Sequence, residues 1–203
     1  MEKRFVLVLG GVRSGKSDFA MKLASDIGEP VLFVATARNP ALGSSLSQGD
    51  EEMRQRIAEH QRRRPNSWRT LEEPLRPAST IAEQEGGANV VLLDCVTVWA
   101  ANVLESCSPG GLDTPDLETA QEQLADEMGG LHDWHRASPA SLILVSNEVG
   151  MGLVPPYPSG RVFRDLLGWA NQFLAVRATE VYLLVAGIPI ELKALAATPW
   201  RSQ

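Results

Sequence analysis

Five short apolar runs are distributed along the chain, and each has the length of a β-strand. They are rich in valine and leucine and lack the alternating polar residues of a strand with one face in water. The runs are Phe5 to Leu9, Val31 to Ala35, Val90 to Leu93, Leu142 to Val145 and Val181 to Val185. Strands of this kind are buried on both faces, so we expect an α/β fold with a mostly parallel sheet covered by helices.

Apolar residues recur at helical spacing between these runs. Each such stripe is most simply the buried face of a helix that packs on the sheet. The stripes are Phe19, Leu23 and Ile27; Leu117, Ala120, Leu124, Met128 and Leu131; and Val162, Phe163, Leu166, Ala170, Phe173 and Leu174. The segment from about Ser44 to Arg64 has few apolar residues and many charges. We interpret it as a helix on the surface or against another subunit.

The composition fits one globular domain that spans residues 1–203. The chain is 44% hydrophobic and 22% charged, and no linker or repeat divides it. Its net charge of -6 argues against general nucleic-acid binding. Neither Cys95 nor Cys107 has metal-ligand spacing, and Cys95 is interpreted as a small core residue. No window approaches the roughly 18 to 20 apolar residues of a membrane span, so we expect a cytoplasmic protein.

The first apolar run leads directly into a phosphate-binding pattern, G-x-x-x-x-G-K-[ST]. It comprises Gly10, Gly11, Val12, Arg13, Ser14, Gly15, Lys16 and Ser17. Glycines let backbone N–H groups surround an anion, and the helix that follows presents its positive N-terminal end. Lys16 can reach the β- and γ-phosphates, and the Ser17 hydroxyl can bind Mg²⁺. The pattern predicts a P-loop NTPase-type, RecA-like domain that binds a nucleotide.

Asp94 closes the run Val90 to Leu93 and is the candidate acidic partner of the P-loop. At the end of a nearby strand it would complete the magnesium shell together with Ser17. The alternative is that its side chain caps a helix that begins at Val96. The P-loop itself does not say which reaction the nucleotide undergoes.

Several further segments resemble the bifunctional adenosylcobinamide kinase/adenosylcobinamide-phosphate guanylyltransferase family of cobalamin biosynthesis. The most specific is the string Asn147-Glu148-Val149-Gly150-Met151-Gly152. The resemblance covers nearly the whole chain, and it rests also on Gly10 to Ser17, Val34 to Ala37, Arg56 to Pro65, Trp68 to Glu72, Leu92 to Thr97 and Arg161 to Asp165.

The resemblance implies two reactions. The first transfers the γ-phosphoryl group of ATP or GTP to the aminopropanol hydroxyl of adenosylcobinamide. The second transfers GMP from GTP to that phosphate through a guanylylated histidine, which by position is His60. A neutral imidazole is a competent nucleophile, and a covalent intermediate divides one transfer into two easier ones. Without the resemblance, His60 would be interpreted as a solvated histidine on a polar helix.

The resemblance also implies nucleotide contacts outside the P-loop. The residues concerned are Ala35, Thr36, Ala37, Gln61, Arg62, Arg63, Arg64, Glu72 and Asp94. An acidic side chain can accept both N1–H and N2–H of guanine, and the arginines can clamp phosphate. The arginine run is also consistent with a solvated face, and small residues at 35–37 with close packing. The family forms trimers, so a homo-oligomer is expected.

Other side chains have more ordinary interpretations. Trp68, Trp99 and Trp169 are expected to pack in the core, and His132 and His135 to be structural or exposed. The loop from Asn147 to Gly152 either contacts a ligand or is a rigid connection. Two rival functions remain at this point, a P-loop small-molecule kinase without a covalent step and a nucleotide-dependent regulatory protein.

Overall fold

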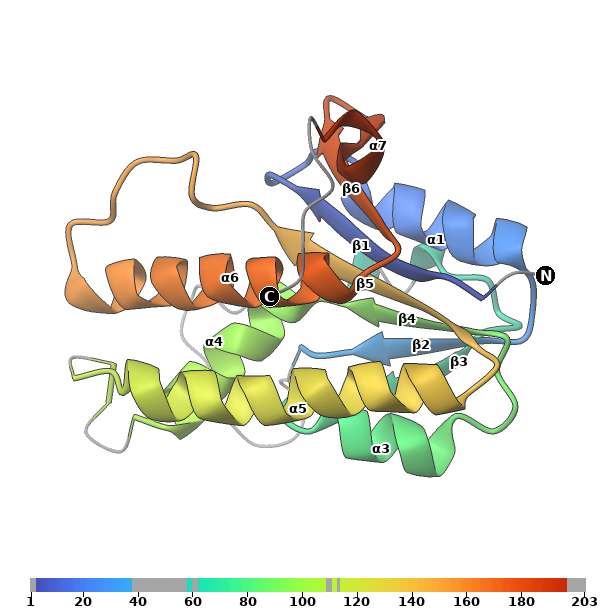
Figure 1. The fold of residues 1–203 in the computed structure, drawn as a ribbon, viewed down its shortest axis with the longest axis horizontal. Coiled ribbons are helices and arrows are strands. Elements are labelled where there is room, and N and C mark those ends of the chain that lie inside the picture. The colour runs from blue at the N-terminus through green and yellow to red at the C-terminus, as the bar shows by residue number, and fades with distance from the viewer. Residues whose placement is uncertain (1–2, 38–57, 60–61, 109–110, 113, 197–203) are drawn as a thin grey trace.

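A seven-stranded sheet forms the centre of the computed structural model, which describes residues 3–37, 58–59, 62–108, 111–112 and 114–196 (Figure 1). The strand order is β3-β2-β4-β5-β1-β6-β7. The strands are β1 (Phe5–Gly10), β2 (Val31–Ala35), β3 (Arg69–Glu72), β4 (Val90–Asp94), β5 (Ser141–Asn147), β6 (Glu180–Val185) and β7 (Ile188–Glu191). All neighbours pair in parallel except β6 and β7, which are antiparallel. The predicted mostly parallel sheet is therefore confirmed.

The five predicted strands correspond to β1, β2, β4, β5 and β6, and the two that the sequence did not reveal lie at the sheet edges. β3 is largely exposed and reads Arg-Thr-Leu-Glu, so it carries no apolar run. β7 contains Pro189, and none of its residues is buried. A proline lacks a backbone N–H and is tolerated on an edge strand. Both strands take their place from pairing with a neighbour rather than from burial.

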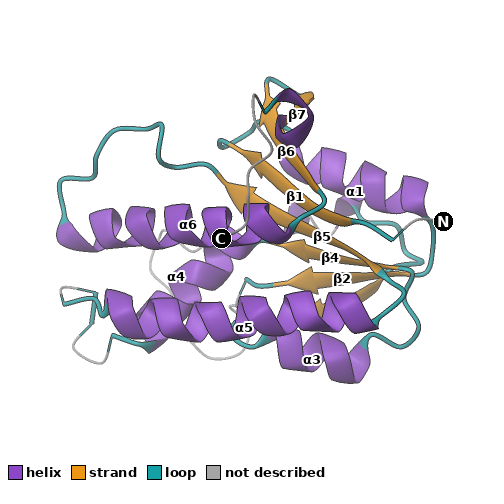
Figure 2. Ribbon diagram, in the orientation of Figure 1, coloured by secondary structure: helices purple, strands orange, loops and turns teal. Residues whose placement is uncertain are grey.

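Helices cover both faces of the sheet unequally (Figure 2). One face packs against α1 (Lys16–Ile27), and the other against helices later in the chain. Those helices are α3 (Pro77–Gln84), α4 (Val96–Ser106), α5 (Leu117–Ala137) and α6 (Pro158–Arg177), and a short α7 (Leu192–Leu195) follows β7. In β1, Val6 and Val8 face α1 while Phe5, Leu7 and Leu9 face the other side, as the two-residue period of a strand requires.

The predicted helical stripes are confirmed for α5, α6 and α1, although in α1 two small residues lie deeper than the predicted large ones. In α5, Ala120, Leu124, Met128 and Leu131 are buried as expected. In α1 the buried residues are Ala20, Ala24 and Ile27, whereas Phe19 and Leu23 are only half-buried at the flanks. Small residues along the centre of α1 let this helix lie close to the sheet, so the large side chains are displaced to its sides.

Packing accounts for Trp68, Trp99 and one histidine. Trp68 and Trp99 are buried, and the Trp99 indole N–H donates to the carbonyl oxygen of Leu75 at 3.0 Å. His135 is buried with its ring centroid 5.4 Å from that of Phe5. The expectation that these side chains are structural is confirmed. Among the helices that the structure describes, none is both long and apolar enough to cross a membrane.

The Leu124→Ala substitution tests the core between α5 and the sheet. Leu124 is fully buried, and its truncation removes buried methyl groups and leaves a cavity. We expect the free energy of unfolding to fall by about 2 to 5 kcal/mol in urea denaturation. Leu195→Ala is the matched control, because Leu195 is 69% exposed and its loss should change stability by less than about 0.5 kcal/mol.

Candidate nucleotide site

The P-loop, Gly10 to Ser17, joins the end of β1 to the start of α1. The helix begins at Lys16, so its N-terminal end lies at the loop. Gly15 precedes the helix with φ of 91°, a left-handed conformation that favours glycine. A side chain on Gly10 would collide with Ser14 Oγ and lie 3.0 Å from the Leu184 carbonyl oxygen. Gly15 is therefore favoured by its φ angle, and Gly10 by the closeness of Ser14 and the Leu184 carbonyl oxygen.

Segments from elsewhere in the chain hold this loop in place. The Gly187 N–H, in the turn between β6 and β7, donates to the Ser14 carbonyl at 2.9 Å. The Glu148 N–H, just after β5, donates to the Gly10 carbonyl at 3.2 Å. Sequence reasoning did not find Gly187, although Ala186-Gly187 between two apolar runs is a recognisable turn signal. The loop is thus fixed by backbone contacts at both of its ends.

Lys16 and Asp94 belong to one site. The Lys16 ammonium donates to the Gly11 carbonyl at 3.1 Å and therefore folds over the loop. Burial lowers the pKa of Lys16, and the nearby Asp94 carboxylate acts in the opposite direction. β1, β5 and β4 are parallel neighbours, with Gly10 opposite Asn147 and Asp94 opposite Val145, so the P-loop and the end of β4 lie at the same carboxyl edge of the sheet.

Hydrogen bonds fasten the ends of β2 and β4 to each other. Ala35 pairs with Asp94, and the Thr36 hydroxyl both donates to the Cys95 carbonyl at 2.8 Å and accepts the Cys95 N–H at 3.0 Å. Buried Asn102 donates to the Thr36 carbonyl at 2.8 Å. Thr36 therefore holds Asp94 in position, and the N-cap of α4 is Cys95, not Asp94.

The donor atoms at this edge fit a magnesium ion. Ser17 lies in the first turn of α1, and Asp94 ends β4 beside Lys16. Magnesium prefers oxygen ligands, and protein sites commonly supply one or two of them while phosphates and water complete the octahedron. One hydroxyl and one carboxylate match that requirement.

The three arginines of the run 62–64 have different surroundings. Arg62 is exposed, with its Nε donating to the Ala58 carbonyl at 3.3 Å. Arg63 forms an ion pair with Asp18 at 3.1 Å, next to Ser17 on α1. Arg64 is half-buried, and its guanidinium carbon lies 3.6 Å from the centre of the Phe33 ring. The run is therefore not a uniform solvated face.

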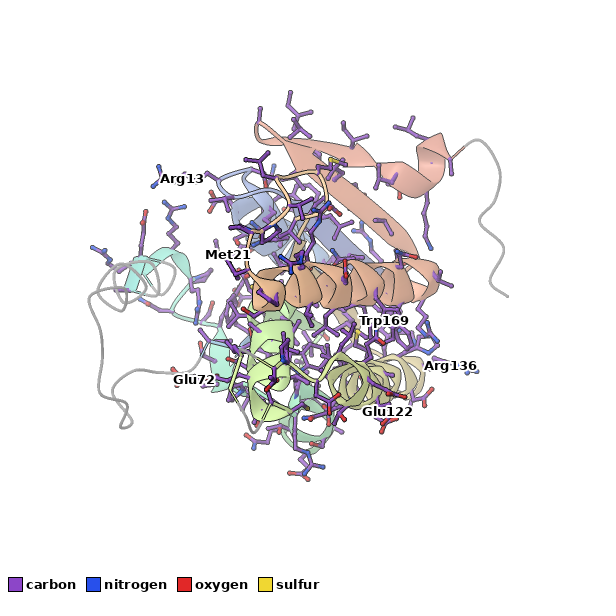
Figure 3. All side chains as sticks on the ribbon, turned by 90° about the vertical axis from the view of Figure 1, so that its left-hand side faces the viewer. Arg13, Met21, Glu72, Glu122, Arg136 and Trp169 are labelled. Atoms are coloured by element: carbon purple, nitrogen blue, oxygen red, sulfur yellow. The ribbon has the colours of Figure 1, made fainter. Side chains whose placement is uncertain are left out.

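Arg64 lies against β2 and β3, over the Phe33 ring and 3.5 Å from the Thr70 hydroxyl oxygen. Burial lowers the pKa of its guanidinium, and Asp94 and Glu72 act in the opposite direction. Its Nε is buried and has no hydrogen-bond partner among the described residues. Figure 3 shows the carboxyl edge of the sheet, with Arg13 of the P-loop and Glu72 at the end of β3 on the same side of the molecule.

His60 and Gln61 lie outside the described residues. The residues on either side, 58–59 and 62–63, are helical. The Arg63–Asp18 ion pair connects this segment to α1 immediately after the P-loop. The roles predicted for His60 and Gln61 therefore stay predictions.

The connection between β5 and α6 leaves the same edge of the sheet. Arg164 donates to the Gly150 carbonyl at 2.6 Å, and Arg161 donates to the Pro156 carbonyl at 2.9 Å. Two arginines of α6 thus hold the loop, while its apolar side chains Met151 and Leu153 are 82% and 97% exposed. The loop is fastened through its backbone and presents its side chains outward.

Comparisons with known proteins bear on this site. The family model "Cobinamide kinase / cobinamide phosphate guanyltransferase" matches residues 6–192. The bifunctional adenosylcobalamin biosynthesis protein CobP of Pseudomonas aeruginosa is 42% identical over 187 residues, which cover 92% of this chain and 96% of that protein. The chain belongs to this family. The resemblance drawn from the sequence is confirmed, and so is the expectation of an enzyme, since the family combines a kinase and a guanyltransferase.

Two further relatives and one solved structure extend the comparison. The bifunctional adenosylcobalamin biosynthesis proteins CobU of Escherichia coli and Salmonella typhimurium are 38% and 37% identical, each over 93% of this chain and 99% of the relative. An ATPase of the type III secretion system aligns with a TM-score of 0.53 at 13% identity, covering 95% of this chain and 59% of that one. At this identity the likeness concerns the fold alone, and it agrees with the predicted α/β fold with a mostly parallel sheet.

Cys95 provides a test of burial at the site. Burial raises the pKa of the Cys95 thiol to about 11, from an ordinary value of 9.0, so at pH 8 its thiolate fraction is about a hundredfold lower. We expect a disulfide reagent at pH 8 to modify Cys107 first and Cys95 slowly. Cys107→Ser should abolish the fast reaction, and urea should make both thiols of the wild type reactive. Fast modification of folded Cys107→Ser protein would contradict the raised pKa of the Cys95 thiol.

Proposed function

We propose that the chain phosphorylates adenosylcobinamide with ATP or GTP and then transfers GMP from GTP to adenosylcobinamide phosphate. The observation that carries the proposal is that Lys16 folds over the P-loop of a member of this family, with Asp94 at the same carboxyl edge of the sheet. Kinase chemistry needs a positive group at the β- and γ-phosphates and an acidic group for the metal shell. The product would be adenosyl-GDP-cobinamide, an intermediate of cobalamin assembly.

In the kinase step, the substrate hydroxyl oxygen forms a bond to the γ-phosphorus. The bond from that phosphorus to the β–γ bridging oxygen breaks, and the hydroxyl proton passes to solvent. Charge grows on the leaving diphosphate, where the P-loop N–H groups and Lys16 would stabilise it. The loop is suited to this because Gly187 and Glu148 already hold its backbone.

Magnesium would be held by Ser17 and Asp94. When bound, it would supply positive charge that offsets the charge of the nucleotide phosphates and favours transfer. Thr36 and Asn102 would contribute indirectly, because they fix the backbone that follows Asp94.

In the second activity, an imidazole nitrogen of His60 would attack the α-phosphorus of GTP and release pyrophosphate. The phosphate oxygen of adenosylcobinamide phosphate would then attack the same phosphorus, and the phosphorus–nitrogen bond would break. The Arg63–Asp18 ion pair supports this assignment, because it connects the segment that includes His60 to α1. The resemblance to the family supplies the identity of the nucleophile.

Further nucleotide contacts are proposed for residues at the same edge. They are Ala35, Thr36, Ala37, Gln61, Arg62, Arg63, Arg64 and Glu72, in addition to the P-loop and Asp94. Glu72 is exposed at the end of β3 and would accept hydrogen bonds from guanine. We also propose that the enzyme acts as a cytoplasmic homotrimer, in which a neighbouring subunit completes the site.

Labelled GTP tests the covalent step. Wild-type protein with Mg²⁺ and α-labelled GTP should retain label that is acid-labile and alkali-stable after denaturation, as a phosphoramidate is. We expect γ-labelled GTP to leave none, and His60→Ala to lose the α-label while still transferring the γ-phosphoryl group to cobinamide. Lys16→Ala is the control, because it should lose both activities.

Each result separates the proposed function from its rivals. If folded, GTP-binding wild-type protein retains no α-label, the covalent step is wrong, and a P-loop small-molecule kinase without that step becomes the better description. Failure to phosphorylate cobinamide as well would favour a nucleotide-dependent regulatory protein.

The surroundings of the arginine run lead to a separate prediction. Arg64 is half-buried beside Asp94 and Glu72, whereas Arg62 is exposed. We expect Arg64→Ala to weaken GTP binding by about tenfold or more, since a partly buried charged hydrogen bond would be lost. Arg62→Ala should change the dissociation constant by less than about twofold. Equilibrium titrations with a fluorescent GTP analogue measure the dissociation constant of each variant. Equal dissociation constants for Arg64→Ala and Arg62→Ala would contradict the prediction.

A further inference from the structure

Asn147 ends the strand that separates the P-loop from Asp94. β5 lies between β4 and β1 in the sheet. Asn147 pairs with Gly10, the first P-loop residue, while Asp94 pairs with Val145. Asn147 therefore lies at the carboxyl edge between the phosphate loop and the acidic residue, where the γ-phosphoryl group of a bound nucleotide would be.

Two side chains from different helices fix the backbone of Asn147. Its N–H donates to the hydroxyl oxygen of Thr97 on α4 at 2.8 Å. Its carbonyl accepts from the side-chain amide of Asn171 on α6 at 3.0 Å. Asn171 is buried and also accepts from the Ser146 hydroxyl at 2.6 Å. This arrangement sets the position of Asn147 independently of the loop that follows it.

The side-chain oxygen of Asn147 takes no part in these bonds. Oδ1 is buried and has no hydrogen-bond partner among the described residues. Buried polar atoms are normally paired, so an exception at the edge of a binding site calls for an explanation. The terminal torsion of an asparagine side chain has a broad range of allowed angles. The amide of Asn147 can therefore rotate without breaking a hydrogen bond from a described residue to Oδ1. A carboxamide has an NH₂ group with two donors, which suits a phosphoryl oxygen.

We propose that Asn147 is a catalytic residue of the phosphoryl-transfer step. Its side-chain amide donates to a non-bridging oxygen of the γ-phosphoryl group as that group leaves the β-phosphate. The inference rests on the proposed kinase activity and adds a donor that faces the P-loop from the neighbouring strand. In the transition state, charge is spread over these oxygens, and a fixed donor stabilises it more than it stabilises bound nucleotide.

Aluminium fluoride with Mg²⁺ and GDP tests this without cobinamide, because the planar fluoride complex mimics the transferring phosphoryl group. For wild-type protein, we expect fluoride to tighten binding of a fluorescent GDP analogue by about tenfold or more. Asn147→Ala should bind GDP alone within about twofold of wild type and lose that tightening. Its cobinamide phosphorylation should fall about 100-fold in kcat with little change in the KM for GTP.

Two further variants serve as controls. Gln172→Ala removes an exposed carboxamide from α6, next to Asn171, and should behave as wild type. Asn147→Asp keeps the shape of the side chain but places a negative charge beside the phosphoryl group, so it should also lose the fluoride effect. Thermal unfolding checks that each variant is folded, and Asn147→Asp carries the test if Asn147→Ala is not.

The outcomes distinguish this inference from the proposed function. Tightening by fluoride that survives in folded Asn147 variants would overturn the inference, as would wild-type protein that binds GDP but gains nothing from fluoride. A fluoride effect that depends on Asn147, without any phosphorylation of cobinamide, would leave the inference standing and overturn the proposed substrate.

Discussion

The parallel pairing of β1 with β5 is the interaction on which the site depends. It places Gly10 opposite Asn147, so the P-loop and the β5–α6 connection leave the sheet side by side. The Glu148 N–H then reaches the Gly10 carbonyl, and the Gly187 N–H reaches the Ser14 carbonyl from the other flank. A loop that binds phosphate through its own N–H groups must be held by other bonds, and here its carbonyl oxygens provide them.

Buried polar side chains gather at the carboxyl edge of an otherwise apolar sheet. Thr36, Asn102, Ser146 and Asn171 are all buried, and each is hydrogen-bonded to strand ends or to the segments that follow them. Burial of such groups is tolerated because they satisfy one another. The consequence is a rigid edge from which Asp94 and Asn147 project with defined positions. Preorganisation of this kind is what electrostatic stabilisation of a transition state requires.

Much of the architecture could be predicted from the sequence because it rests on local patterns. The apolar runs predicted five strands, and the P-loop pattern predicted the turn from β1 into α1. β3 and β7 escaped prediction because edge strands need only one partner and little burial. The inner face of α1 was predicted only in part for a related reason. Large apolar residues draw attention, but Ala20 and Ala24 are fully buried, whereas Phe19 and Leu23 are only partly buried.

By itself, the sequence determined the phosphate loop, the parallel sheet and the family, since each depends on residue types at fixed spacing. Only the tertiary structure distinguished Arg62, Arg63 and Arg64, which are neighbours in sequence but face solvent, α1 and the acidic edge respectively. It alone brought Gly187, Thr97 and Asn171 to the site from distant elements. The physical reason is that strand order decides which ends meet at the carboxyl edge, and pairing between remote segments leaves no local pattern in the chain.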